Sequence, residues 1–223
     1  MATATAEVQK SEVQKSAVQI KAPKFERAKF TITGTSPLVI HRFSSKTKEE
    51  MKAKMETGKA AGSRKNREAK ATDEIYEAAR YRHEDGWDGF HAGAMRNAMI
   101  SASRLVGFKM TLAKLSIFVE ADGWDQAESQ IPLIRIVGKP SKQEDMARVE
   151  TGQPYVTVRA RYFPWSAAIN VRFDADQFTL QDVANLLMRV GAQVGIGEGR
   201  PDSKHSNGMG WGLFEVGAFR GAQ

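Results

Sequence analysis

The stretch GIGEGRPDSKHSNGMGWGLF, residues 195–214, holds six glycines within its first eighteen positions and decides the predicted fold. Glycine adopts positive φ without strain and lets a second backbone approach closely, so its amide groups can be turned toward phosphate oxygens. Before this loop the apolar residues recur at helical spacing, and after it apolar and polar residues alternate as in a strand. That order is the reverse of the Rossmann dinucleotide motif, and no GxxxxGK[ST] segment occurs. The pattern argues against both common nucleotide-binding folds.

The elements on both sides of the loop follow from hydrophobic periodicity. A helix is predicted after Thr179, because Asp182 three positions later gives a start that resembles a capping box. Its apolar stripe consists of Leu180, Val183, Leu187, Val190 and Val194. The same procedure predicts strands at 29–33, 115–120, 155–162, 168–173 and 212–219, and helices at 72–82 and 92–106. In the second of these helices Met95, Met99, Ala102 and Val106 lie on one stripe, a methionine stripe that is typical of a helix side facing the core. The turn-rich segment 122–154 is predicted to form a loop or hairpin outside the core.

Without the insertions, the element order is strand, helix, strand, strand, helix, strand. This order predicts an α+β, ferredoxin-like (RRM-like) βαββαβ core, with a glycine-rich loop before the last strand. Residues 1–23 are predicted to be a flexible tail, and 24–223 a single domain with insertions at about 42–88 and 122–154. Because such a sheet has helices on one face only, its other face and its rim remain available to a ligand.

The positive charge of the chain is concentrated near its start. The formal net charge is +7, yet the first 71 residues contain 16 Lys and Arg against 7 Asp and Glu. The densest part, residues 41–70, holds ten basic and four acidic residues with no strand-like alternation. Such a run is commonly a solvated helical arm. The functional alternative is a clamp for a polyanion, since each phosphate that is neutralised releases counterions.

Composition excludes several kinds of site. The chain has no cysteine, so disulfides, thiolate metal sites and a cysteine nucleophile are ruled out. Its four histidines show no metal-binding spacing, and we expect neither a metal nor a cofactor. No signal peptide and no apolar run of membrane-spanning length is present, so we expect a cytoplasmic protein with no membrane partner.

Two motifs resemble a known family. The first is the helix followed by GxG at 195–197, several polar residues and a second GxG at 208–210 that enters the last strand. The second is GFHAGAMRNAM, residues 89–99, which is similar to an "IPGSSLKGALR"-like segment that opens the first helix, with Arg96 in place of its lysine. Together they resemble the RAMP (repeat-associated mysterious protein) superfamily of CRISPR-associated RNA-binding proteins, of the backbone-subunit type, or a phage or mobile-element relative.

The resemblance implies a ferredoxin-like palm with a basic thumb inserted between the first strand and the first helix. In this family the thumb binds the RNA backbone and subunits stack along it. We therefore expect a single-stranded RNA or DNA partner, self-association along the nucleic acid, and other subunits of an effector complex.

The predicted nucleic-acid-binding residues combine the basic arm, the helix-opening motif, one strand face and the glycine loop. Arg159 and Arg161 lie on the same side of a strand, where they repel each other unless an anionic partner or nearby carboxylates compensate. Phe118, Tyr155 and Trp211 are interleaved with arginines, the mixture that lets bases stack while phosphates pair. The predicted contacts are His41, Arg42, Lys46, Lys48, Lys52, Lys54, Arg64, Lys65, Arg67, Arg96, Asn97, Arg159, Arg161, Gly195, Gly197, Gly199, Arg200, Lys204, His205, Gly208, Gly210 and Trp211.

The favoured function is a non-catalytic, sequence-tolerant single-stranded nucleic-acid binder with a preference for RNA. One alternative is a phage single-stranded DNA-binding or annealing protein on the same scaffold. A second is an endoribonuclease that uses His41, the candidate acid or base after the first strand, since the segment 30–72 contains no Asp. A third is an assembly protein whose basic arm binds the acidic face of a protein partner.

Overall fold

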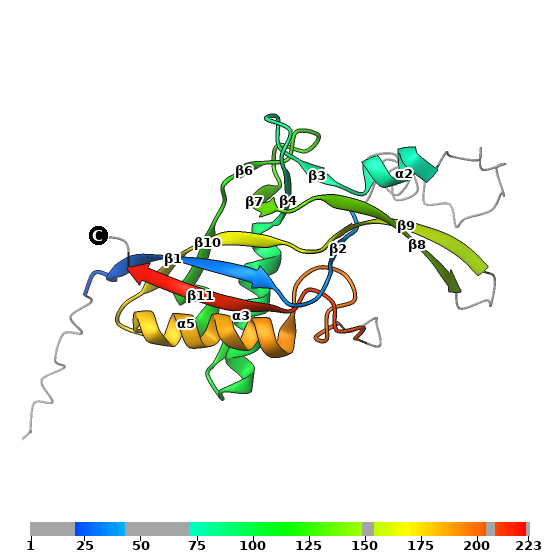
Figure 1. Cartoon of the computed structure of the whole chain (residues 1–223). Coiled ribbons are helices and arrows are strands. Elements are labelled where there is room, and N and C mark those ends of the chain that lie inside the picture. The colour runs from blue at the N-terminus through cyan, green and yellow to red at the C-terminus, as the bar shows by residue number, and fades with distance from the viewer. Residues whose placement is uncertain (1–20, 43–71, 149–153, 204–207, 222–223) are drawn as a thin grey trace, which may run out of the picture.

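The computed structural model describes residues 21–42, 72–148, 154–203 and 208–221. Most of the predicted tail, the basic arm at 43–71 and the residues 204–207 lie outside the described residues. The described chain is a mixed α+β fold with two antiparallel sheets and few helices, compatible with the RRM-like fold that the sequence predicts (Figure 1).

The larger sheet has the strand order β11-β1-β10-β7-β4-β3, with β5 also paired to β10 and β6 to β7. The smaller sheet has the order β2-β9-β8. The strands of the larger sheet are β1 (Phe25–Gly34), β3 (Tyr81–Arg82), β4 (Asp88–His91), β5 (Ile117–Glu120), β6 (Gly123–Trp124), β7 (Pro132–Val137), β10 (Ser166–Asp174) and β11 (Phe214–Gly221). Those of the smaller sheet are β2 (Leu38–Ile40), β8 (Pro140–Arg148) and β9 (Pro154–Tyr162). The helices are α2 (Thr72–Ala78), α3 (Ala92–Leu105), α4 (Met110–Ser116), α5 (Leu180–Arg189) and the π-helix η1 (Val190–Val194).

The predicted alternation of β1 and β10 produces the core. Phe30 and Ile32 on β1 and Ile169 and Val171 on β10 are fully buried, because alternate side chains of a strand point to the same face. Helices α3 and α5 lie against this face (Figure 1). The other face of β1 and β10 carries the intervening polar side chains.

Local signals set the helix ends. Thr179 and Asp182 form a complete capping box at the start of α5, as predicted. Met95 and Met99 of α3 are fully buried, which confirms the methionine stripe, and α3 begins where the ring of His91 accepts a hydrogen bond from the Gly93 N–H at 2.8 Å. Among the described residues, no helix combines the length and the apolar composition that crossing a bilayer requires.

Four sequence predictions are wrong in detail. The segment 122–154 is not outside the core, because β7 joins the main sheet and its Leu133 and Ile134 are fully buried. Leu115 lies in the last turn of α4 instead of beginning a strand, and it is 71% exposed. Val106 is exposed beyond the end of α3. The helix that starts at Thr72 stops at Ala78, since the chain turns there to form β3.

Candidate nucleic-acid interface

The described parts of the glycine-rich loop, residues 195–203 and 208–213, are joined by backbone hydrogen bonds to the strand β2 and to Pro37 just before it. The Glu198 N–H donates to the Val39 carbonyl at 2.9 Å, and the Gly212 N–H donates to the Pro37 carbonyl at 2.8 Å. A third attachment holds the loop to α3, where Asp202 accepts hydrogen bonds from the Ser101 hydroxyl and from the Arg104 guanidinium. The loop is therefore a fixed edge beside β2 and β9, which Figure 1 shows in orange next to β2.

The glycines permit this close approach. Gly197 has a φ of +76°, and a Cβ placed there would lie 2.6 Å from the Val39 carbonyl oxygen. Gly212 has a φ of +70° and passes so near the Ile196 carbonyl that no Cβ fits. Positive φ and backbone contact both require glycine at these positions. The glycine pattern thus reflects the attachment of the loop as well as any role of its amides.

Arg159 on β9 is held by carboxylates from two elements. Its Nη2 lies 2.7 Å from Oε1 of Glu198, its Nε also donates to the Glu198 carboxylate, and its Nη1 lies 3.3 Å from Oδ2 of Asp145. Only 14% of this side chain is exposed. The fork of a guanidinium on a carboxylate is geometrically specific, so it ties the glycine loop to β9. The sequence leaves two explanations for the neighbouring Arg159 and Arg161, an anionic partner or nearby carboxylates. For Arg159 the explanation is nearby carboxylates.

Arg161, the next residue on the same face of β9, is in a different situation. Its guanidinium carbon lies 5.9 Å from the centre of the Phe163 ring. Among the described residues it makes no ion pair, and its side chain is partly exposed. It is therefore a cation available to an external anion, next to a fixed loop.

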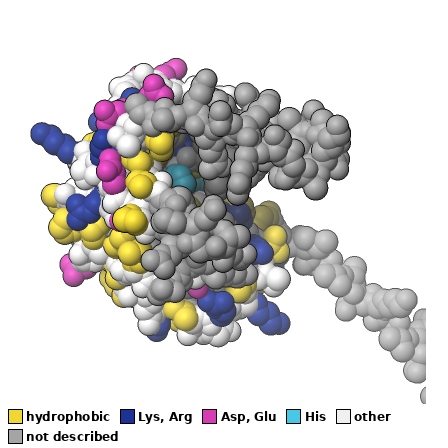
Figure 2. All heavy atoms as spheres, turned by 90° about the vertical axis from the view of Figure 1, so that its right-hand side faces the viewer, with side chains coloured by type: hydrophobic (Ala, Val, Ile, Leu, Met, Phe, Trp, Pro, Cys, Tyr) yellow, Lys and Arg dark blue, Asp and Glu magenta, His cyan; other side chains and the backbone are white. Residues whose placement is uncertain are grey.

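His41 lies between the loop and β9. Its Nδ1 is 3.7 Å from Oε2 of Glu198, and 37% of its side chain is exposed. Burial lowers the pKa of His41 below its ordinary value, and the nearby Arg159 acts in the same direction, although Glu198 opposes them. The imidazole is consequently neutral at pH 7. Figure 2 views the molecule from the right-hand side of Figure 1, where β8 and β9 lie, and shows a histidine and Lys and Arg side chains on that face.

The loop offers one partly exposed main-chain donor, the N–H of Gly197, because Gly199 is buried. Within the described part of the chain, the N–H groups of Gly197 and Gly199 have no protein acceptor, whereas those of Gly195, Glu198, Asp202 and Gly212 bond internally. The Arg200 side chain bonds the Gly197 carbonyl at 3.0 Å and so stabilises the loop itself. The Trp211 ring packs over Gly199. The remaining loop glycines, Gly195, Gly208 and Gly210, all have positive φ.

Three other predicted contacts lie away from this cluster. Arg42 is only 8% exposed and lies 3.2 Å from carboxylate oxygens of both Asp125 and Glu128. Arg96 donates to the Ile117 and Lys114 carbonyls and so caps the junction of α4 and β5. Asn97 is exposed on α3. The predicted contacts outside the described residues are Lys46, Lys48, Lys52, Lys54, Arg64, Lys65, Arg67, Lys204 and His205.

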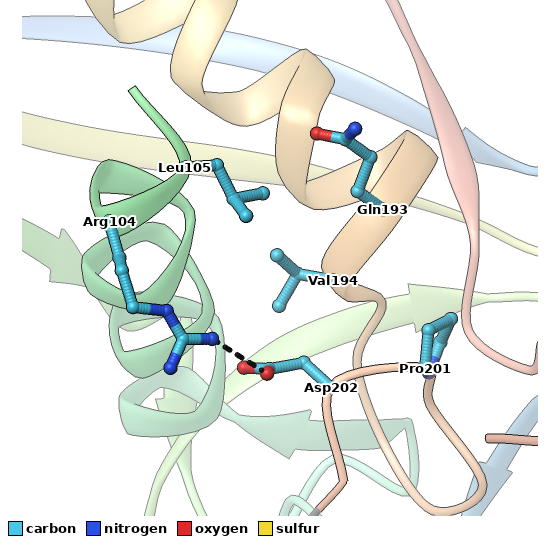
Figure 3. A pocket seen from close by; sticks show the side chains of 6 residues that line it. All are labelled: Arg104, Leu105, Gln193, Val194, Pro201 and Asp202. Carbon is cyan, nitrogen blue, oxygen red and sulfur yellow. Dashed lines mark hydrogen bonds and ion pairs between the residues drawn. The ribbon is translucent and has the colours of Figure 1, made fainter. Parts of the chain in front are cut away.

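A cavity of about 170 Å³ lies at the base of the loop, between it, η1 and the end of α3. Figure 3 shows Arg104 and Asp202 joined across it at 3.1 Å, with Leu105, Gln193, Val194 and Pro201 around them. This volume is below the range of ordinary small-molecule sites. The cavity is better explained as a packing defect beside Asp202, where the loop is hydrogen-bonded to α3.

Sequence reasoning missed the residues that join distant segments. Glu198 pairs with Arg159, and Asp145 and Thr157 complete the same cluster. No local pattern signals a contact across 39 residues. Among the described residues, no group of three or more His, Asp or Glu side chains is arranged to hold a metal ion.

No family model matches the sequence, and no curated protein matches it. Among solved structures, the chain is similar to one from the "Cryo-EM structure of the Type III-B Cmr-beta bound to cognate target RNA", with a TM-score of 0.47 and 9% identity. The match covers 90% of this chain and 61% of that chain, so this protein spans less than two thirds of its neighbour. At this distance the likeness assigns no family.

Proposed function

We propose that the chain is a non-catalytic single-stranded nucleic-acid-binding protein, with RNA as its preferred ligand. The observation that carries the proposal is the convergence of a fixed glycine loop, the available cation Arg161 and neutral His41 on one side of the small sheet. These groups come from three separate parts of the sequence. An amide donor and an arginine beside it suit a phosphate, and a partly exposed Phe163 adds an apolar surface for a sugar or base.

The strand pairing supports the finer fold proposal. With β1, β5, β10 and β11 taken as the four strands of a βαββαβ unit, the order β11-β1-β10-β5 is the fourth, first, third and second, and every neighbouring pair is antiparallel. Helix α3 lies between the first and second of these strands, and α5 between the third and fourth. We take this as a ferredoxin-like core, and 24–223 as one domain with its basic insertion before α3.

The RAMP resemblance extends the proposal to assembly. A backbone-like subunit would bind along a strand beside further copies of itself and other subunits of a ribonucleoprotein complex. The basic arm at 43–71 is proposed as its additional phosphate contact, because it contains nine of the ten basic residues of the dense segment.

The test is a gel shift with matched RNA and DNA oligomers at several salt concentrations. The wild-type chain is expected to bind, more tightly to RNA, and with an affinity that falls steeply as salt rises. Arg161→Gln is expected to weaken binding, whereas Arg189→Gln is the matched control because Arg189 is exposed on α5. Equal effects of the two substitutions would contradict the proposed site. A preference for DNA would favour the phage alternative.

One observation favours a second candidate function, RNA cleavage. A neutral imidazole, partly exposed and 3.7 Å from a carboxylate, can accept a proton from a ribose hydroxyl. An RNA oligomer that stays intact with the wild-type protein, or is cleaved equally by His41→Ala, removes this alternative.

A further inference from the structure

The face of the large sheet that α3 and α5 leave uncovered presents an arrangement of arginine and phenyl groups. Arg27 on β1 lies opposite Arg172 on β10, and Arg172 lies opposite Phe118 on β5, so the three residues form one row across the sheet. Phe25 begins β1 next to this row. Because α3 and α5 lie on the other side of the strands, this row faces outward (Figure 1).

Two arginines directly opposite each other on neighbouring strands destabilise a sheet unless each is compensated. Arg27 is compensated by Glu120, 2.9 Å away. Within the described residues, the Arg172 side chain makes no ion pair or hydrogen bond. Its guanidinium carbon lies instead 4.9 Å from the centre of the Phe25 ring and 4.7 Å from that of Phe118.

The two rings are held in place, and of the two Phe25 is exposed whereas Phe118 is half-buried. Phe25 and Phe118 meet edge to face, with centroids 5.8 Å apart and planes at 68°. Arg96, fixed by its hydrogen bond to the Ile117 carbonyl, lies 4.9 Å from the Phe118 centroid. Phe25 remains 37% exposed. Lys29, two residues after Arg27 on β1, is exposed and without an ion-pair partner among the described residues.

We propose that Phe25, Phe118 and Arg172 form a second nucleic-acid subsite, in which a base stacks on Phe25 while Arg172 binds a neighbouring phosphate. This inference rests on the proposed function. An exposed ring next to an arginine without an ion-pair partner suits a single strand, since every base has a face that can stack and every phosphodiester carries a negative charge. The subsite lies at the opposite end of β1 from the glycine loop, roughly 30 Å away for ten strand residues.

The test measures affinity for an oligoadenylate of about 20 nucleotides, as RNA and as DNA, and for inorganic polyphosphate, which has no bases. Phe25→Ala is expected to weaken oligoadenylate binding roughly tenfold and to leave polyphosphate binding unchanged. Phe25→Tyr is expected to bind oligoadenylate and polyphosphate like the wild type, because the aromatic ring is kept. Arg172→Gln is expected to weaken binding to both probes and to lower the salt slope by about one.

Met188→Ala is the matched control, since Met188 is an exposed apolar side chain on α5, across the sheet. Thermal melting verifies that each variant is folded. A Phe25→Ala variant that binds oligoadenylate like the wild type, or loses oligoadenylate and polyphosphate equally, would overturn the subsite and leave the proposed function standing. A wild-type chain that binds neither RNA nor DNA would overturn both.

Discussion

Replacing Gly197 with alanine tests whether the glycine loop is clamped to β2. Two effects add at this position. An L-residue with a φ near +76° is destabilised by about 1–2 kcal/mol. In addition, the new Cβ would lie 2.6 Å from the Val39 carbonyl and 2.9 Å from a Leu38 methyl group, so the loop must move away. That movement breaks the 2.9 Å hydrogen bond from Glu198 to Val39, which contributes about 1 kcal/mol.

The expected loss of unfolding free energy for Gly197→Ala is therefore about 2–3 kcal/mol. Gly210→Ala is the matched control: its φ is +73°, but nothing lies within 4 Å of the added Cβ. Only the conformational strain of about 1–2 kcal/mol applies there. Urea denaturation measures the loss of unfolding free energy of both variants, provided that their m-values equal that of the wild type. Equal destabilisation of the two variants would refute the close attachment of the loop to β2.

Three further predictions concern binding, pH and the buried arginine. Arg161→Gln is expected to reduce the slope of log affinity against log salt by about one, measured by fluorescence anisotropy with a single-stranded RNA, and an unchanged slope would contradict a phosphate contact. Burial lowers the pKa of His91 and that of His41 below the ordinary value of 6.5, so the unfolded chain binds more protons than the folded chain. Stability is therefore lost as pH falls through about 6.5. The melting temperature measured against pH should show this loss, with a smaller decline in His91→Gln. Arg42→Met leaves Asp125 buried without its cation and is expected to lower stability by about 3–5 kcal/mol in urea denaturation, while a loss below 1 kcal/mol would contradict the buried ion pair.

The sequence predicted the elements with strong local signals. The capping box at Thr179 and the methionine stripe of α3 are in the structure as predicted, because both depend on contacts within one or two helical turns. The alternation of β10 likewise predicts which side chains enter the core.

Contacts between distant segments determine the features that the local patterns do not predict. The apolar run in β7 is short and flanked by turn residues, so it resembles a surface hairpin, yet pairing with β10 and β4 buries it. Arg42 comes directly after an apolar strand, a position from which an arginine commonly reaches solvent. In the structure it is instead buried and paired with Asp125 and Glu128, which come from a distant segment. Arg159 and Glu198 are joined by the way the loop folds back on β9, which periodicity does not encode.

The proposed function requires a single strand to contact the glycine loop and β9. Titrating the ¹⁵N-labelled chain with a single-stranded RNA and following the amide resonances tests this directly. The largest shifts are predicted at Gly197, Gly199 and Arg161, with His41 alongside them. If RNA leaves these four resonances unmoved, or shifts only amides on the helical side of the sheet, then the glycine loop and β9 do not form the interface.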